Sequence, residues 1–380
     1  MTARTVPATG SGGGVQGVRA RARAARLPRD LHPVAWYAWA IGLATAASST
    51  TNPLVLGLLL AVATLVVVAR RSDQPWAASF RLYLWLALFV LVLRVVFRIV
   101  FGGSYPGTVL LDLPEIPLPD WVLGVRLLGP LTQEGLLSGV YDGLRLATII
   151  VCIGAANALA NPKRLLRSVP PALHEVGTAL VVAVTVLPQL ADSVRRVRAA
   201  QQLRAGEERR VRGLRRVLVP VLEDALERSL ALAAGMDARG YGRAPGQTRR
   251  ERWTTGALLL VGLGGICVGV YGVLDQTAPR VLAAPMLVLG VVVAVAGLVS
   301  AGRRVDRTRY RADRWRWPEL VVVASGVVVG VVGVWAARNQ VPIAYPDLTR
   351  VPEISLALLL GVLVGALAAV VAPEPRTVAA

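Results

Sequence analysis

The feature that most constrains this chain is a series of apolar runs, each about as long as a membrane is thick. A transmembrane helix needs about twenty predominantly apolar residues. Apolar residues make up 54% of the 380 residues and charged residues 17%, and the mean hydropathy is +0.56. These values exclude an ordinary water-soluble globule. The sequence therefore predicts an all-α polytopic membrane protein with about eight transmembrane helices, over roughly 34–50, 53–69, 82–101, 143–160, 256–274, 281–300, 319–336 and 354–372.

The formal net charge of +19 is concentrated between the apolar runs. Arginines gather in residues 1–30, in 163–252 and in 303–316, whereas 102–142 is mainly acidic. Because Lys and Arg favour the cytoplasmic side of a membrane, we expect both termini in the cytoplasm and 102–142 outside the cell. The clustering favours anionic lipid headgroups and a cytoplasmic protein as partners, and we expect no nucleic-acid partner.

A further apolar stretch, at about 176–190, is shorter and contains Pro188. If this stretch crossed the membrane, the arginine-dense region 191–252 would lie outside, against the charge preference. We therefore place 176–190 as a helix in the cytoplasm or in the membrane interface, and both alternatives stay open. With this choice the remaining predicted spans alternate and leave the C-terminus in the cytoplasm.

These assignments divide the chain into five segments. We expect a disordered basic tail at 1–30, membrane helices 1–4 in 31–162, cytoplasmic helices in 163–252, membrane helices 5–6 in 253–302, and an additional C-terminal membrane hairpin with a short tail in 303–380. The last part also looks duplicated, because "RRERW" (Arg249–Trp253) and "RADRW" (Arg311–Trp315) each precede a glycine-rich helical pair. Small residues at helical spacing let membrane helices approach closely.

The cytoplasmic segment between the fourth and fifth predicted spans reads as helix, break, helix. The first helix follows from about 189, and the second runs from about 215 to 239. Charged residues are too frequent for either helix to span a bilayer, since each would cost a few kcal/mol at its centre. The apolar residues that recur at helical spacing in the second helix are Leu218, Val221, Leu222, Ala225, Leu226, Leu230 and Ala234.

Both cytoplasmic helices end in arginine and glycine, at Leu203-Arg204-Ala205-Gly206 and at Ala238-Arg239-Gly240. Glycine tolerates the left-handed conformation that ends a helix, and arginine in the last turn complements the helix dipole. Each end can therefore be a helix cap and nothing more. A guanidinium that projects past a helix tip is also a planar fork of five donors, suited to carboxylates and backbone carbonyls of a docking partner.

The segment resembles the coupling region of the transmembrane T component of energy-coupling-factor (ECF) transporters, which are ABC-type importers of vitamins and transition metals. That family carries two Ala-Arg-Gly motifs at the ends of cytoplasmic coupling helices. Ala238-Arg239-Gly240 matches the second motif in full. In the first, Leu203-Arg204 aligns with Ala-Arg, Ala205 stands where glycine is expected, and Gly206 comes one residue late. "NALANPKRLLRSVP" (Asn157–Pro170) and "LPQLADSVRRVRAAQQLR" (Leu187–Arg204) also resemble the family, over roughly residues 30–275 in all.

The resemblance implies a multi-pass scaffold of the cell membrane that is not an enzyme. In the family, the T component holds a small substrate-binding S subunit in the membrane and rests on two cytoplasmic ABC ATPase subunits, which its two arginine motifs contact. Closure of the ATPases moves the coupling helices, and substrate choice belongs to the S subunit. The chain contains no G-x-x-x-x-G-K-[ST] pattern, so it is not itself the ATPase.

Two other functions are an intramembrane enzyme and a stand-alone secondary transporter or membrane anchor. An intramembrane enzyme would need buried catalytic groups or metal ligands. The two cysteines, Cys152 and Cys267, lie in separate apolar runs, and the two histidines, His32 and His174, are far apart in the sequence. We therefore expect no metal site and no cofactor.

Arg94 and Arg98 are charged residues inside a predicted membrane helix, 82–101. An ionised group at membrane depth suggests a function by default. These arginines lie towards the outer end of the helix, where arginine can reach the interface, and Asp142 near the next predicted helix is a candidate partner. We interpret Arg94, Arg98 and Asp142 as an intramembrane structural pair.

Overall fold

The computed structural model describes residues 29–72, 78–101, 107–112, 114, 128–168, 174–203, 210–240, 248–275, 279, 282–303 and 315–375. These residues belong to two compact units, Met1–Leu165 with Arg311–Ala380, and Leu166–Tyr310. The predicted tail 1–30, except for its last two residues, lies outside the described residues, as does most of the arginine-rich loop 303–316.

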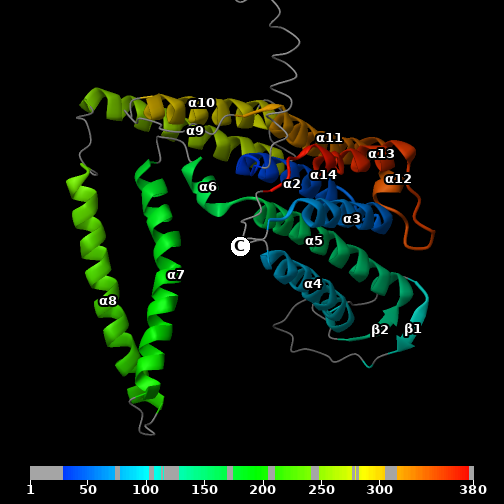
Figure 1. The fold of residues 1–380 in the computed structure, drawn as a ribbon. Helices are drawn as coiled ribbons and strands as arrows, with labels where there is room; N and C mark the ends of the chain where they lie inside the picture. Colours follow the sequence, from blue (N-terminus) through cyan, green and yellow to red (C-terminus); the bar gives the residue numbers. More distant parts are fainter. Residues whose placement is uncertain are drawn as a thin grey trace, which may run out of the picture. The chain divides into compact units, whose positions relative to one another are not determined.

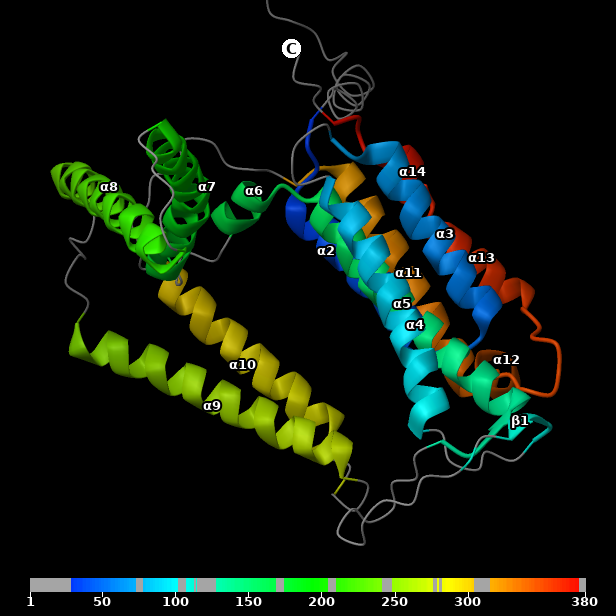
Figure 2. The same cartoon turned by 90° about the horizontal axis from the view of Figure 1, so that it is seen from below.

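The first unit is a bundle of helices with one small β-hairpin (Figures 1 and 2). Its elements in chain order are α2 (Pro33–Ser48), α3 (Pro53–Arg70), α4 (Phe80–Phe101), β1 (Val109–Asp112), β2 (Pro130–Thr132), α5 (Gln133–Leu159), α11 (Trp317–Asn339), α12 (Val341–Ala344), α13 (Leu356–Val364) and α14 (Leu367–Val371). The short helix α6 (Pro162–Arg167) contains the boundary between the units.

The second unit contains two helical pairs (Figure 1). Their members in chain order are α7 (His174–Leu203), α8 (Arg210–Ala238), α9 (Arg249–Leu274) and α10 (Ala284–Arg303). Helix α7 packs on α8, and α9 packs on α10.

The all-α polytopic membrane fold is confirmed, and the helices that make it up differ in part from the prediction. Seven helices in the described part of the chain are long and apolar enough to cross a membrane by length and composition. Six of them, α3, α4, α5, α9, α10 and α11, correspond to predicted spans. The seventh lies in α7, over Val176–Ala200. Placement of 176–190 in the cytoplasm or interface rests on charge alone and stays a prediction.

Two predicted spans are shorter than expected. Helix α2 has 16 residues, about 24 Å at 1.5 Å per residue, against a hydrocarbon core of about 30 Å. The last predicted span forms an apolar stretch, Leu356–Val371, that is divided into α13 and α14.

Helix α5 begins ten residues before the predicted span, at Gln133. The Thr132 hydroxyl accepts a hydrogen bond from the Gly135 amide at 3.2 Å, and Glu134 in the first turn complements the helix dipole. The antiparallel β1–β2 hairpin before α5 was not predicted from the sequence. Part of the predicted external acidic segment 102–142 is therefore helix and hairpin, and most of the remainder lies outside the described residues.

Helices α2 and α11 pack closely at positions where both carry small residues. A Cβ added at Gly42 would overlap the Gly326 carbonyl, and a Cβ added at Gly326 would overlap the backbone of Trp39. Further along, a Cβ at Gly333 would meet Ala46. Because both sequences advance in the same direction along the contact, the two helices run parallel.

The N-terminal ends of α2 and α11 are joined by a buried ion pair. Arg29 Nη1 lies 2.7 Å from Glu319 Oε1, and Arg29 Nη2 donates to Glu319 Oε2 at 3.0 Å. The Glu319 side chain is 1% exposed. The rings of His32 and Trp315 lie 5.2 Å apart at the same end.

At the opposite end, Asn52 joins the turn between α2 and α3 to the C-terminal segment. Its Oδ1 accepts from the Leu54 amide at 3.0 Å and so caps α3. Its Nδ2 donates to the carbonyls of Ile343 at 2.8 Å and Glu353 at 2.7 Å. The C-terminal segment, which the sequence predicts as an additional hairpin, is therefore part of the core of the first unit.

The two glycine-rich pairs near the C-terminus are built differently. In α9–α10, Gly265 and Gly290 face each other, and a Cβ at Gly265 would meet the Gly290 Cα at 2.9 Å. The glycines of α11 instead face α2, as shown above. Helix α11 therefore packs on α2 as well as on α13 and α14, and the predicted C-terminal membrane hairpin stays a prediction.

Candidate coupling segment

Helix α7 joins two stretches that the sequence analysis separated, the apolar run 176–190 and the charged helix from about 189. It is continuous over His174–Leu203 with Pro188 inside it. A proline removes one backbone hydrogen bond, a cost that the rest of this 30-residue helix outweighs. One continuous helix therefore connects the apolar run to Leu203, the first residue of the first arginine motif.

Helices α7 and α8 are held together by a polar cluster around Asp224. Ser193, 2% exposed, donates its hydroxyl to Asp224 Oδ2 at 2.5 Å. Arg228 Nε donates to Asp224 Oδ1 at 3.0 Å, and Arg196 Nη2 lies 3.4 Å from Oδ2. The Ser193 hydrogen bond, followed by the charge of Arg228, lowers the pKa of Asp224 below its ordinary value. Asp224 is thus a carboxylate at neutral pH and fixes where α7 meets α8.

Only part of the predicted apolar stripe on α8 faces α7. Val221 is 8% exposed. Its four leucines form an exposed row, which we call the α8 leucine row, with exposed fractions of 51% to 62%: Leu218, Leu222, Leu226 and Leu230. An exposed apolar row on a helix that also carries many charges marks a contact surface.

The second arginine motif ends α8 with the geometry of a glycine cap. Gly240 has φ +75°, in the left-handed region that glycine adopts without strain. The amide of Arg239 donates to the Met236 carbonyl at 3.1 Å, and the amide of Gly240 donates to the Asp237 carbonyl at 2.9 Å. Ala238, Arg239 and Gly240 are all exposed. The motif is a helix end whose guanidinium is accessible to a partner.

The first arginine motif follows the end of α7. Leu203, the last residue of α7, is 90% exposed. Arg204, Ala205 and Gly206 lie outside the described residues. Because α8 contains 29 residues, about 44 Å separates its two ends at 1.5 Å per residue. Leu203 precedes one end of α8 and Arg239 follows the other, so these two residues belong to opposite ends of the α7–α8 pair.

The charged group of α4 lies against α5. Arg94 Nη2 lies 3.5 Å from Asp142 Oδ2, with side chains 51% and 41% exposed. Arg98 Nε donates to the Gly135 carbonyl at 3.2 Å. The structure thus brings Arg94 and Asp142 together, and it places Arg98 against the backbone of the first turn of α5.

A polar network between α2, α4 and α5 was missed by sequence reasoning. Tyr37 donates its hydroxyl to Asn157 Oδ1 at 2.6 Å, and Asn157 Nδ2 donates to the Tyr83 oxygen at 2.7 Å. The only signal in the sequence was an asparagine near the end of an apolar helix. Among the described residues, no group of three or more His, Cys, Asp and Glu side chains could hold a metal ion.

Comparison with known proteins assigns this architecture to a family. Residues 24–249 match the family described as CbiQ, cobalt transport protein. Three relatives carry the name energy-coupling factor transporter transmembrane protein EcfT. The protein from Leuconostoc gelidum subsp. gasicomitatum is 27% identical over 202 residues, which cover 46% of this chain and 74% of the relative. That from Exiguobacterium sibiricum is 34% identical over 130 residues (31% and 48%), and that from Thermotoga maritima is 31% identical over 176 residues (39% and 65%).

The matches thus span between about half and three quarters of the length of these relatives. The matched relatives are named as membrane components of transporters and not as enzymes. Helices α9 to α14 lie beyond the segment that matches the family, except for Arg249, the first residue of α9. Since that segment includes more than half of the chain, the chain belongs to the CbiQ family, the transmembrane component of energy-coupling-factor transporters.

Proposed function

We propose that the chain is the scaffold and coupling subunit of an ECF-type importer. It links ATP hydrolysis by two cytoplasmic ABC ATPase subunits to a small substrate-binding membrane S subunit, for uptake of a vitamin or a transition metal. The observation that carries the proposal is the α7–α8 pair, in which Leu203 and Arg239 belong to ends about 44 Å apart along α8. Two ends this far apart can each contact a separate protein partner.

The cluster around Asp224 supports transmission of force through the pair. A displacement at one end of α7 or α8 reaches the other helix only if their crossing point does not slide. The Ser193 hydrogen bond and the Arg196 ion pair, both from α7 to Asp224 on α8, fix that point. Arg239 at the end of α8 offers a bidentate donor to carboxylates or carbonyls of an ATPase.

The α8 leucine row supports a second contact of a different chemistry. Charged tips suit the polar surface of an ATPase, whereas an apolar row loses water most favourably against another apolar surface. We assign the row to contacts with the membrane-embedded S subunit. The same pair of helices then touches both kinds of partner.

Two observations support cytoplasmic termini. Helices α2 and α11 run parallel, and both begin after arginine-rich segments, residues 19–29 and 303–316. Parallel helices with basic residues before both N-terminal ends obey the preference of Lys and Arg for the cytoplasm. Ser48 and Asn339, the last residues of the two helices, then lie near the outer surface.

The test is co-purification from cells that make the chain with two ABC ATPases and a small membrane protein encoded beside it. We expect the tagged chain to retain both ATPases. Arg204→Ala and Arg239→Ala should each weaken retention, and the double variant should abolish it. Arg195→Ala is the matched control, because Arg195 is an 81% exposed arginine of α7 whose ion-pair partner is the exposed Asp192. Failure of the wild-type chain to retain any ATPase would refute the proposal.

A further inference from the structure

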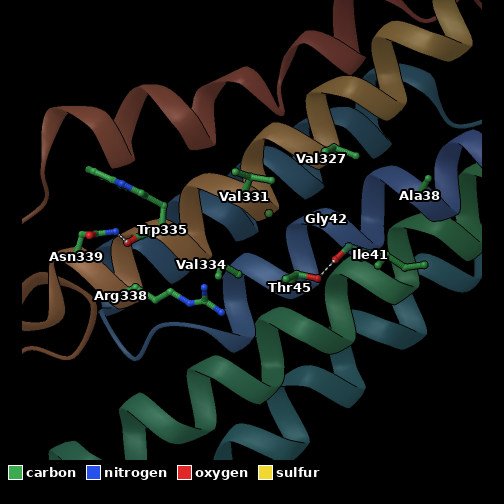
Figure 3. A pocket seen from close by; sticks show the side chains of 11 residues that line it. Ala38, Ile41, Gly42, Thr45, Val327, Val331, Val334, Trp335, Arg338 and Asn339 are labelled. Atoms are coloured by element: carbon green, nitrogen blue, oxygen red, sulfur yellow. Dashed lines mark hydrogen bonds between the residues drawn. The ribbon is translucent and has the colours of Figure 1, made fainter. Parts of the chain in front are cut away.

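A groove of about 560 Å³ runs along the surface where α2 and α11 meet (Figure 3). Its lining includes Gly42 and Gly330, small residues at which the two helices approach each other. Its sides include Ile41 from α2 and Val331 from α11, which are 63% and 62% exposed. The same small residues that bring the backbones together thus leave an apolar channel between the two ridges.

The length of the groove corresponds to one leaflet of a membrane. On α11 its lining extends from Val327 to Asn339, twelve residue steps or about 18 Å at 1.5 Å per residue. Half of a hydrocarbon core of about 30 Å is about 15 Å. A packed transmembrane helix would need a groove along the whole of α11, whereas an acyl chain of one leaflet needs only this length.

One end of the groove is polar and cationic. Arg338 lies in the last turn of α11, and its side chain extends towards α2 (Figure 3). Within the described part of the chain, no carboxylate forms an ion pair with Arg338. Trp335 also lines this end, and tryptophan is enriched at the level of lipid headgroups. The groove therefore combines an apolar channel with a cation at interfacial depth.

We propose that this groove binds an anionic phospholipid, with one acyl chain between α2 and α11 and the phosphate on the Arg338 guanidinium. A guanidinium binds phosphate oxygens through paired, charge-assisted hydrogen bonds. Under the orientation proposed above, the lipid belongs to the outer leaflet. Helix α11 lies beyond the family match, and none of the groove residues belongs to the α7–α8 pair.

The test uses the full chain in nanodiscs of phosphatidylcholine and phosphatidylglycerol, with a trace of phosphatidylglycerol that carries a photoreactive group in its acyl chain. Peptide mass spectrometry locates the label. We expect label on the groove residues of α2 and α11, and about fivefold less in Arg338→Gln, the change that corresponds to about 1 kcal/mol for one cation near an anionic surface. Arg350→Gln, in the exposed segment after α12, should leave the label unchanged.

A second variant tests the apolar channel with Arg338 intact. Ala38→Phe places a ring in the groove, whereas Val34→Phe adds the same ring to an exposed position of α2 that does not line it. We expect Ala38→Phe alone to reduce the label. Equal labelling by a photoreactive phosphatidylcholine, or unchanged labelling in both Arg338→Gln and Ala38→Phe, would overturn the proposal. If the groove loses the lipid label in the assembled transporter because a partner subunit covers it, that result would also overturn the proposal.

Discussion

Loss of the Arg29–Glu319 ion pair should destabilise the chain strongly. The two side chains form two hydrogen bonds, and Glu319 Oε2 also accepts from the Arg316 amide at 3.1 Å at the start of α11. Glu319→Gln removes the charge and one acceptor while keeping the shape. Arg29 is 15% exposed at its side chain, so the variant leaves a largely buried guanidinium without its counter-ion.

The expected cost is about 3 kcal/mol. Removal of one partner from a buried ion pair costs roughly 3–5 kcal/mol, because the other charge stays buried and unpaired. The lower end applies here, since part of Arg29 reaches the surface. Arg29→Met with Glu319→Gln removes both charges, so the double variant should lose at least about 1 kcal/mol less than the sum of the two single variants.

The assay is unfolding of the purified chain in mixed detergent micelles, followed by tryptophan fluorescence. Glu353→Gln is the control, because Glu353 is an exposed carboxylate of the same unit. A change below about 1 kcal/mol for Glu319→Gln, or an additive double variant, would contradict the packing of α11 against the start of α2.

Three further predictions concern other contacts. Because the Ser193 hydroxyl lowers the pKa of Asp224, the carboxylate stabilises the α7–α8 pair at a pH above the ordinary aspartate pKa of about 3.9, and this contribution disappears as the pH falls through the lower folded pKa. Pulsed-label distance measurements across the pair should therefore show α7 and α8 separating in the wild type as the pH falls. The Asp224→Asn variant should show no such dependence of stability on pH over the same range. Asn157→Leu should cost about 1–3 kcal/mol for each tyrosine hydroxyl left without a partner, measured by the same micellar unfolding. Gly42→Leu should lower folded yield in size-exclusion chromatography, whereas Gly57→Leu should not, since a Cβ at Gly57 meets nothing within 4 Å.

Apolar length and composition were sufficient to predict most of the membrane helices. They predicted the helix at 34–50 but not its length, because α2 ends at Ser48 and its 16 residues fall short of a standard span. They also could not predict that α11 lies beside α2, because the two helices are almost three hundred residues apart. Glycine spacing indicated that α11 would pack closely on some helix, but spacing alone carries no information about the partner.

The candidate site was predictable at its ends and not at its centre. Arg239 and Gly240 are neighbours in sequence, and a helix that ends at such a pair is a local event that glycine permits. Ser193 and Asp224 lie on different helices, 31 residues apart, and their contact depends on how α7 crosses α8. Helical periodicity placed Val221 and the α8 leucine row on one apolar face. The crossing decides that Val221 is buried while the α8 leucine row is exposed.

The central claim is that the two ends of the α7–α8 pair contact two different ATPase subunits. The most direct measurement places a photocrosslinking amino acid at Leu203 or at Arg239 in the complete transporter and identifies the cross-linked subunit by mass spectrometry. We expect each position to cross-link to one ATPase, and the two positions to choose different ATPases. Cross-links from both positions to the same subunit, or to neither ATPase, would contradict the account.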